Sequence, residues 1–62
     1  MSIMRLFGKF VIRRTDQGGG YVARPGSAHS YTKNILDAQT FRTREVAEVQ
    51  RCVENEVIER VN

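Results

Sequence analysis

Cys52 and His29 are the residues of this 62-residue chain whose types most directly suggest chemistry, because a thiol and an imidazole can form a nucleophile and its general base. A chain of this length has little room for the pocket and the oxyanion-binding groups that such a pair requires. Cys52 also stands at the edge of an apolar helical pattern, where a free cysteine usually behaves as a small hydrophobic residue. One cysteine and one histidine do not make a zinc-type ligand set.

Two further patterns raise the question of phosphate or metal binding. Gly18-Gly19-Gly20 lacks the lysine and the hydroxyl residue of a P-loop and joins two predicted strands, so a hairpin turn is the better interpretation. The second pattern is a set of five glutamates, Glu45, Glu48, Glu54, Glu56 and Glu59. Glu45 and Glu48 share one side of the predicted helix and each has an arginine within pairing distance, which favours a solvated helix face. We therefore predict that the protein is not an enzyme and has neither a metal site nor a cofactor.

The outer face of a predicted hairpin is the strongest indication of binding. With Ile12 opposite Val22, alternation along the strands directs one set of side chains to solvent. This set comprises Lys9, Val11, Arg13, Tyr21 and Ala23. Basic residues interleaved with an aromatic ring suit single-stranded nucleic acid, and tyrosine and arginine also dominate protein interfaces. The predicted binding residues are Lys9, Arg13, Tyr21, Arg24 and Tyr31, and the five glutamates form an alternative acidic surface.

A helix over residues 44–54 is the element that we expect to organise the fold. Thr43 can accept a hydrogen bond from the first turn and so cap it, and Asn55 can end it in the left-handed conformation. Three valines recur at i, i+3 and i+7, and we expect them to share a buried face, with Val49 among the most buried residues. They are Val46, Val49 and Val53. Val49→Ala would then cost about 1–3 kcal/mol of stability.

The remaining segments predict an α+β fold in which a small antiparallel sheet of three or four strands packs on this helix, in the order β-β-(β)-α-β. The expected strands are 5–14, 20–24 and 56–61, with 39–41 as a short strand, 31–32 as a strand or an anchored loop, and one helical turn at 36–38. We expect a single domain over residues 1–62, frayed at residues 1–4. The predicted core is Leu6, Phe10, Ile12, Val22, Phe41, Val46, Val49, Val53 and Ile58.

Composition and charge narrow the class of protein. Charged residues make up 27% of the chain and hydrophobic residues 40%, as in a folded domain, and no apolar run exceeds three residues, so no membrane span is predicted. There is no signal-peptide pattern, and a single cysteine excludes an internal disulfide, which together predict a cytoplasmic protein. Residues 1–44 carry eight basic side chains against two acidic ones, whereas residues 45–62 carry two basic against five acidic. Such a dipolar surface suits an anionic partner on one side.

The order of these features resembles small accessory proteins encoded by phages and prophages. The resemblance lies in Phe10-Val11-Ile12-Arg13, Gly20-Tyr21-Val22-Ala23, Ser30-Tyr31-Thr32, Ala38-x-Thr40-Phe41-x-Thr43-Arg44-x-x-Ala47-Glu48 and Glu56-Val57-Ile58. Some proteins of this size and build are anti-CRISPR inhibitors, which dock on a host effector complex and share no common motif. The resemblance implies a fold and a mode of action, and it carries over no residue roles.

These observations lead to one hypothesis and one alternative. The first is a non-enzymatic, monomeric phage-type protein of the host cytoplasm that inhibits a host protein or nucleoprotein complex by docking, with an anti-CRISPR inhibitor of a Cas effector complex as its most specific form. The alternative is a nucleic-acid-binding module that uses the basic hairpin face. Neither hypothesis involves a membrane.

Overall fold

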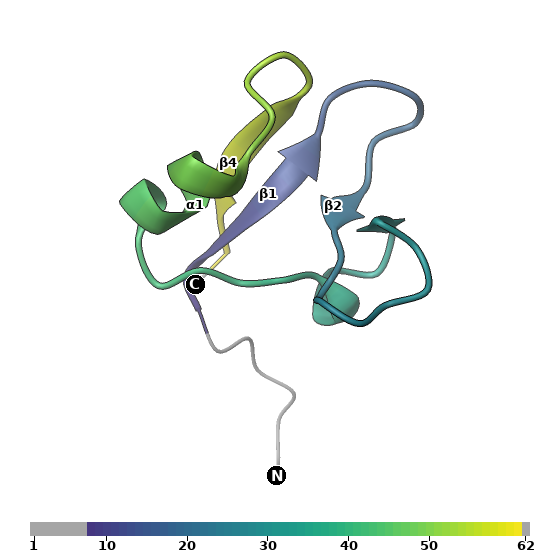
Figure 1. Ribbon diagram of the computed structural model, residues 1–62, viewed down its shortest axis with the longest axis horizontal. Coiled ribbons are helices and arrows are strands. Elements are labelled where there is room, and N and C mark those ends of the chain that lie inside the picture. Colours follow the sequence, from purple (N-terminus) through teal and green to yellow (C-terminus); the bar gives the residue numbers. More distant parts are fainter. Residues whose placement is uncertain (1–7, 62) are drawn as a thin grey trace, which may run out of the picture.

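The computed structural model describes residues 8–61. Four strands form one antiparallel sheet in the order β3-β2-β1-β4, and a single α-helix lies across β1 and β4 (Figure 1). The elements are β1 (Phe10–Arg14), β2 (Tyr21–Val22), β3 (Tyr31–Thr32), the 3-10 turn η1 (Ile35–Asp37), α1 (Arg44–Gln50) and β4 (Glu56–Arg60). The predicted α+β class is confirmed. Expectations for Leu6, for the frayed residues 1–4 and for the start of the first strand lie outside the described residues.

The predicted strands are confirmed in place but are shorter than expected. Tyr31-Thr32 is a strand, whereas residues 39–41 contribute only an isolated bridge between Phe41 and Phe10. Arg13 pairs with Tyr21, which is the register that sets Ile12 opposite Val22. Between β1 and β2 the chain turns through four successive residues with positive φ, Gln17 to Gly20, a conformation for which glycine is suited.

The core lies between the sheet and α1. Ile12, Phe41 and Ala47 are buried there, and the side chains of Phe10, Val22 and Ile58 pack against them in half-buried positions. Five of the nine predicted core residues therefore do form the core: Phe10, Ile12, Val22, Phe41 and Ile58. The pairing of Ile12 with Ile58 fixes which face of β4 is turned to the helix.

The helix begins as predicted and ends early. The side chain of Thr43 accepts a hydrogen bond of 3.2 Å from the backbone N–H of Val46, as a capping residue does. The prediction that the helix continues to residue 54 is wrong, because Arg51 already has extended backbone angles (φ −82°, ψ 151°). Asn55 is not its left-handed stop, since Gln17 is the only residue other than glycine with positive φ between residues 8 and 61.

The prediction of a buried valine face is also wrong. Val46, Val49 and Val53 are 51%, 82% and 74% exposed, whereas Ala47 is fully buried. The sheet and Phe41 already supply the bulky side chains of the core, so α1 contributes only a small residue that lets its backbone approach closely. Val49→Ala is therefore not expected to leave a cavity.

Candidate binding surfaces

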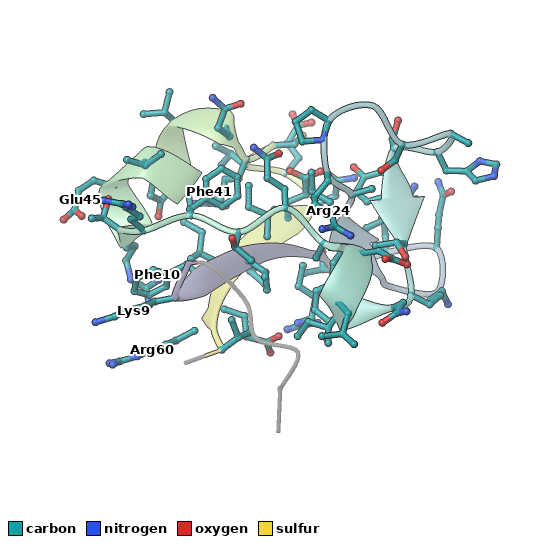
Figure 2. All side chains as sticks on the ribbon, turned by 90° about the horizontal axis from the view of Figure 1, so that it is seen from below. Lys9, Phe10, Arg24, Phe41, Glu45 and Arg60 are labelled. Atoms are coloured by element: carbon teal, nitrogen blue, oxygen red, sulfur yellow. The ribbon has the colours of Figure 1, made fainter. Side chains whose placement is uncertain are left out.

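The structure does not bring the five predicted binding residues together. Arg13 and Tyr21 face each other on the side of the sheet away from α1. Tyr31 pairs with Val22, whose side chain packs with Ile12, so Tyr31 lies on the α1 side. The other two, Lys9 and Arg24, are exposed at separate places in the chain, before β1 and after β2 (Figure 2).

The hairpin face is not the exposed basic platform that the sequence predicts. Val11 and Ala23 are buried rather than solvent-facing, so that part of the prediction is wrong. Arg13 forms an ion pair with Glu59, in which Nε and Oε2 are 3.4 Å apart. Arg24 similarly pairs with Asp37 at 3.2 Å.

Arg14 forms the shortest of the three ion pairs made by the hairpin arginines. Arg14 Nε donates a hydrogen bond of 2.7 Å to Asp16 Oδ1. This bond from Arg14 holds the pKa of the Asp16 carboxyl below its ordinary value. Each arginine of the hairpin thus has a carboxylate partner within the protein, which weakens its attraction for a phosphate group.

Tyr31 and Glu56 form a structural link rather than two separate binding surfaces. The Tyr31 hydroxyl donates a hydrogen bond to Glu56 Oε2, and Glu56 Oε1 accepts one of 2.7 Å from the backbone N–H of Cys52. The Arg14 guanidinium lies over the Tyr31 ring, 4.3 Å from its centroid. The bond to Glu56 and partial burial raise the pKa of Tyr31. The link joins β3 to β4, the two outer strands of the sheet, and the sequence gives no signal for it.

The five glutamates also divide between environments. Glu56 is buried, and Glu59 pairs with Arg13 on the far side of the sheet. Three remain exposed on α1 and the turn after it, namely Glu45, Glu48 and Glu54. Glu48 accepts a hydrogen bond of 2.7 Å from Arg51. The predicted acidic surface is therefore limited to these three residues.

The exposed valines and these three glutamates together form what we call the α1 outer surface. Val46 and Val49 lie one turn apart on the helix, and Val53 follows in the turn that leads to β4. The valines were predicted as core, so sequence reasoning recognised the apolar pattern and assigned it to the wrong side. An exposed group of apolar side chains on so small a domain indicates an interaction surface.

A second surface, which we call the basic end, was not predicted as a unit. It comprises Lys9, Arg42, Arg44 and Arg60, all exposed. The backbone N–H of Lys9 donates to the carbonyl of Phe41 at 2.9 Å, which brings Lys9 beside Arg42. Figure 2 shows Lys9 and Arg60 extending to the same side, close to Phe10. Of the four, only Lys9 was among the predicted binding residues.

The reactive residue types do not converge. Cys52 is exposed at the end of the α1 segment, and His29 lies with Arg24 and Asp37 along a hollow beside β3. The hollow measures about 280 Å³, slightly below the ~300–1,000 Å³ typical of small-molecule sites. Within residues 8–61 no three histidine, cysteine, aspartate or glutamate side chains are grouped so that they could hold a metal ion.

The described residues define a small α+β domain with two distinctive surfaces, one apolar and acidic, the other basic. The chain matches no family model, no curated protein and no solved structure. No helix between residues 8 and 61 has the length and apolar character needed to cross a membrane.

Proposed function

We propose that this chain is a non-enzymatic binding domain that docks on another protein through the α1 outer surface. The observation that supports the proposal is the exposure of Val46, Val49 and Val53, which range from 51% to 82% exposed. Burying a valine side chain in an interface releases about 1.5 kcal/mol or more. The helix is held from the other side by Ala47, so docking requires no rearrangement of the core.

The charges around the valines select the partner. Glu45, Glu48 and Glu54 are exposed on the same segment. Of the two arginines beside them in the sequence, Arg51 is engaged by Glu48 and by the Glu56 carbonyl at 2.6 Å, and Arg44 lies over the Phe10 ring. The complementary occupant is a segment with an apolar stripe flanked by lysine or arginine, such as a basic amphipathic helix. This favours the acidic version of the predicted docking surface over the hairpin version.

The most specific form of the proposal is a phage-type inhibitor that acts as a monomer in the host cytoplasm on a CRISPR–Cas complex. The resemblance in sequence motivates it, and the acidic, apolar surface supports it, because protein subunits that hold nucleic acid present basic grooves. One standard interface of about 800 Å² per partner is enough for a small domain to block a larger assembly. Expression in a CRISPR-active host should restore phage plating, and unchanged plating would exclude this form.

A direct test of the docking surface uses a synthetic amphipathic peptide of leucine and lysine as the probe. Titration calorimetry should show binding by the wild-type chain and a loss of about tenfold or more for Val46→Ser with Val49→Ser, equivalent to ~1.4 kcal/mol. Val57→Ser is the matched control, since Val57 is also exposed but lies on the opposite face of the sheet. Equal binding by all three chains would refute the proposal.

Self-association is tested in the same samples. The proposed partner is a different protein, so sedimentation equilibrium should show monomers for wild-type and Val46→Ser/Val49→Ser chains alike. A wild-type dimer that these two substitutions dissociate would mean that a second copy covers the valines, and the proposal would be wrong.

A further inference from the structure

Most of the described arginines and lysines fall into two groups that differ in their partners, and Lys33, which donates to the carbonyl of Gly18, belongs to neither. Among the described residues, Arg13, Arg14, Arg24 and Arg51 each pair with a carboxylate. At the basic end, Lys9, Arg42 and Arg44 are exposed and form no ion pair with any residue between 8 and 61. From this contrast we infer that the basic end binds the phosphate backbone of nucleic acid. The inference does not depend on the α1 outer surface.

The basic end is held together by backbone contacts between distant segments. Phe10 and Phe41 exchange two hydrogen bonds, of 2.8 and 3.1 Å, which fix the start of β1 against the segment that precedes α1. Arg42 follows Phe41 directly, Arg44 begins α1 two residues later, and Arg60 of β4 is the strand partner of Phe10. Cations from three parts of the sequence therefore lie around the backbone bridge between Phe10 and Phe41. The hydrogen bonds of this bridge and of the β1–β4 pairing hold them in place.

Arg44 is oriented before any ligand arrives. Its guanidinium carbon lies 5.3 Å from the centroid of the Phe10 ring, and Phe10 is itself packed into the core. Stacking on an aromatic ring restrains a guanidinium while its N–H groups stay able to donate to phosphate oxygens. A restrained donor loses less entropy on binding than a free side chain does.

The arrangement suits a polymer better than a single anion. Lys9, Arg42 and Arg44 are all exposed, so water surrounds an ion that any one of them contacts. Exposed charges gain little from one ion, whereas a nucleic acid releases a counterion at each phosphate that is neutralised. These contacts go to the backbone, so we expect little dependence on base sequence.

Glu45 provides an internal check on this electrostatic argument. It follows Arg44 on α1 and lies on the same side of the molecule as Phe10 and Lys9 (Figure 2). Its negative charge opposes an approaching phosphate. Glu45→Gln should therefore tighten binding, because it removes this negative charge without adding a cation.

The experiment measures fluorescence anisotropy of a labelled oligothymidylate and a labelled duplex at several salt concentrations, beginning near 50 mM. Each phosphate contact on a single strand contributes a slope of about 0.7 in log affinity against log salt. Lys9→Gln with Arg42→Gln should lower the slope by about 1.4, which corresponds to a loss of roughly 60-fold near 50 mM salt. Both probes are expected to bind.

The control removes the same net charge elsewhere. Arg13→Gln with Arg24→Gln alters two arginines that are already paired with carboxylates, and it should change oligothymidylate affinity far less. Circular dichroism melts confirm that each variant folds, and any variant that does not fold is replaced by its two single substitutions. Equal losses for both double variants would overturn the inference, because net charge alone would then explain binding.

Three further outcomes complete the test. No binding by the wild-type chain at micromolar concentration and low salt would overturn the inference, as would binding to vesicles of anionic phospholipid without binding to either nucleic acid. Unchanged or weaker binding by Glu45→Gln would also count against it. Val46→Ser with Val49→Ser should leave oligothymidylate affinity intact, so failure of the docking proposal and failure of this one are distinguishable.

Discussion

Replacing Tyr31 by phenylalanine should destabilise the domain by about 1–2 kcal/mol. The Tyr31 hydroxyl donates to Glu56, a residue that is 6% exposed, and hydrogen bonds to a charged group contribute about 1.5–3 kcal/mol each. Tyr31 is itself half-buried, so water compensates part of the loss. Glu56 keeps its bond from Cys52 but loses the donor to its other oxygen. For a domain of about 60 residues, 1 kcal/mol lowers the melting temperature by roughly 8 °C.

Tyr21→Phe is the matched control, because it makes the same chemical change on the opposite face of the sheet. Tyr21 is half-buried and its hydroxyl forms no hydrogen bond with residues 8–61. Thermal melts followed by circular dichroism should give nearly wild-type stability for Tyr21→Phe and a melting temperature lower by roughly 8–16 °C for Tyr31→Phe. If the two variants have the same melting temperature, the link between β3 and β4 does not stabilise the fold and the reasoning is refuted.

The same link predicts how stability depends on alkaline pH. The pKa of Tyr31 is raised in the folded state, mainly by its hydrogen bond to Glu56. The folded chain therefore holds the proton more tightly than the unfolded chain, whose tyrosine pKa is about 10. The stabilisation that the protonated Tyr31 gives to the folded state is complete below the unfolded-state pKa and is lost as pH rises through the folded-state pKa. Denaturant titrations above pH 10 should show a smaller loss of stability in Tyr31→Phe than in the wild-type chain.

Four other substitutions test the fold. Val49→Ser should change the free energy of unfolding by less than about 0.5 kcal/mol, because Val49 is largely exposed. Ala47→Leu should cost about 1–3 kcal/mol, because the larger side chain overfills the space under α1. If urea titrations show a larger loss for Val49→Ser than for Ala47→Leu, the valines rather than Ala47 face the core. Gly8→Ala should cost more than about 1 kcal/mol, since a Cβ there would lie 2.5–2.7 Å from backbone atoms of Phe41, and a wild-type melting temperature would contradict this close approach. The pKa of Asp16 is lowered, so its contribution is present above about pH 3.9 and lost as pH falls through the folded-state value. Asp16→Asn should therefore make stability decline less steeply in acid, and an unchanged acid titration would show that the ion pair adds nothing.

Local sequence signals predicted the local features of this fold well. Glycines at 18–20 indicated the turn, the hairpin has the register considered from the sequence, with Ile12 opposite Val22, and Thr43 marked the start of the helix. Each of these depends on residues that are close together in the chain. The end of the helix was missed because it depends on Glu56, which lies beyond the helix. The Glu56 side chain accepts a hydrogen bond from the backbone N–H of Cys52 where the chain turns toward β4.

The buried face of α1 could not be predicted from periodicity alone. Val46 and Val49 form a regular apolar stripe, and a stripe indicates which residues share a face without stating which face meets the sheet. That choice was decided by volume, since Phe10, Ile12 and Phe41 fill the space beneath the helix and leave room only for Ala47. Sequence position likewise did not reveal which arginines are neutralised, because Arg13 meets Glu59 only through the pairing of β1 with β4.

The charge division along the sequence therefore does not correspond to the charge division in space. The basic part of the sequence, residues 1–44, supplies Arg13, Arg14 and Arg24, and all three are neutralised by carboxylates. Arg60 comes from the acidic part of the sequence and joins Lys9 because β4 returns antiparallel to β1. Internal pairing balances the charge of the hairpin, whereas Lys9, Arg42 and Arg44 at the opposite end of β1 form no ion pair with residues 8–61. Substitutions at the basic end and at the hairpin therefore separate binding by cations without a carboxylate partner from binding by net charge alone.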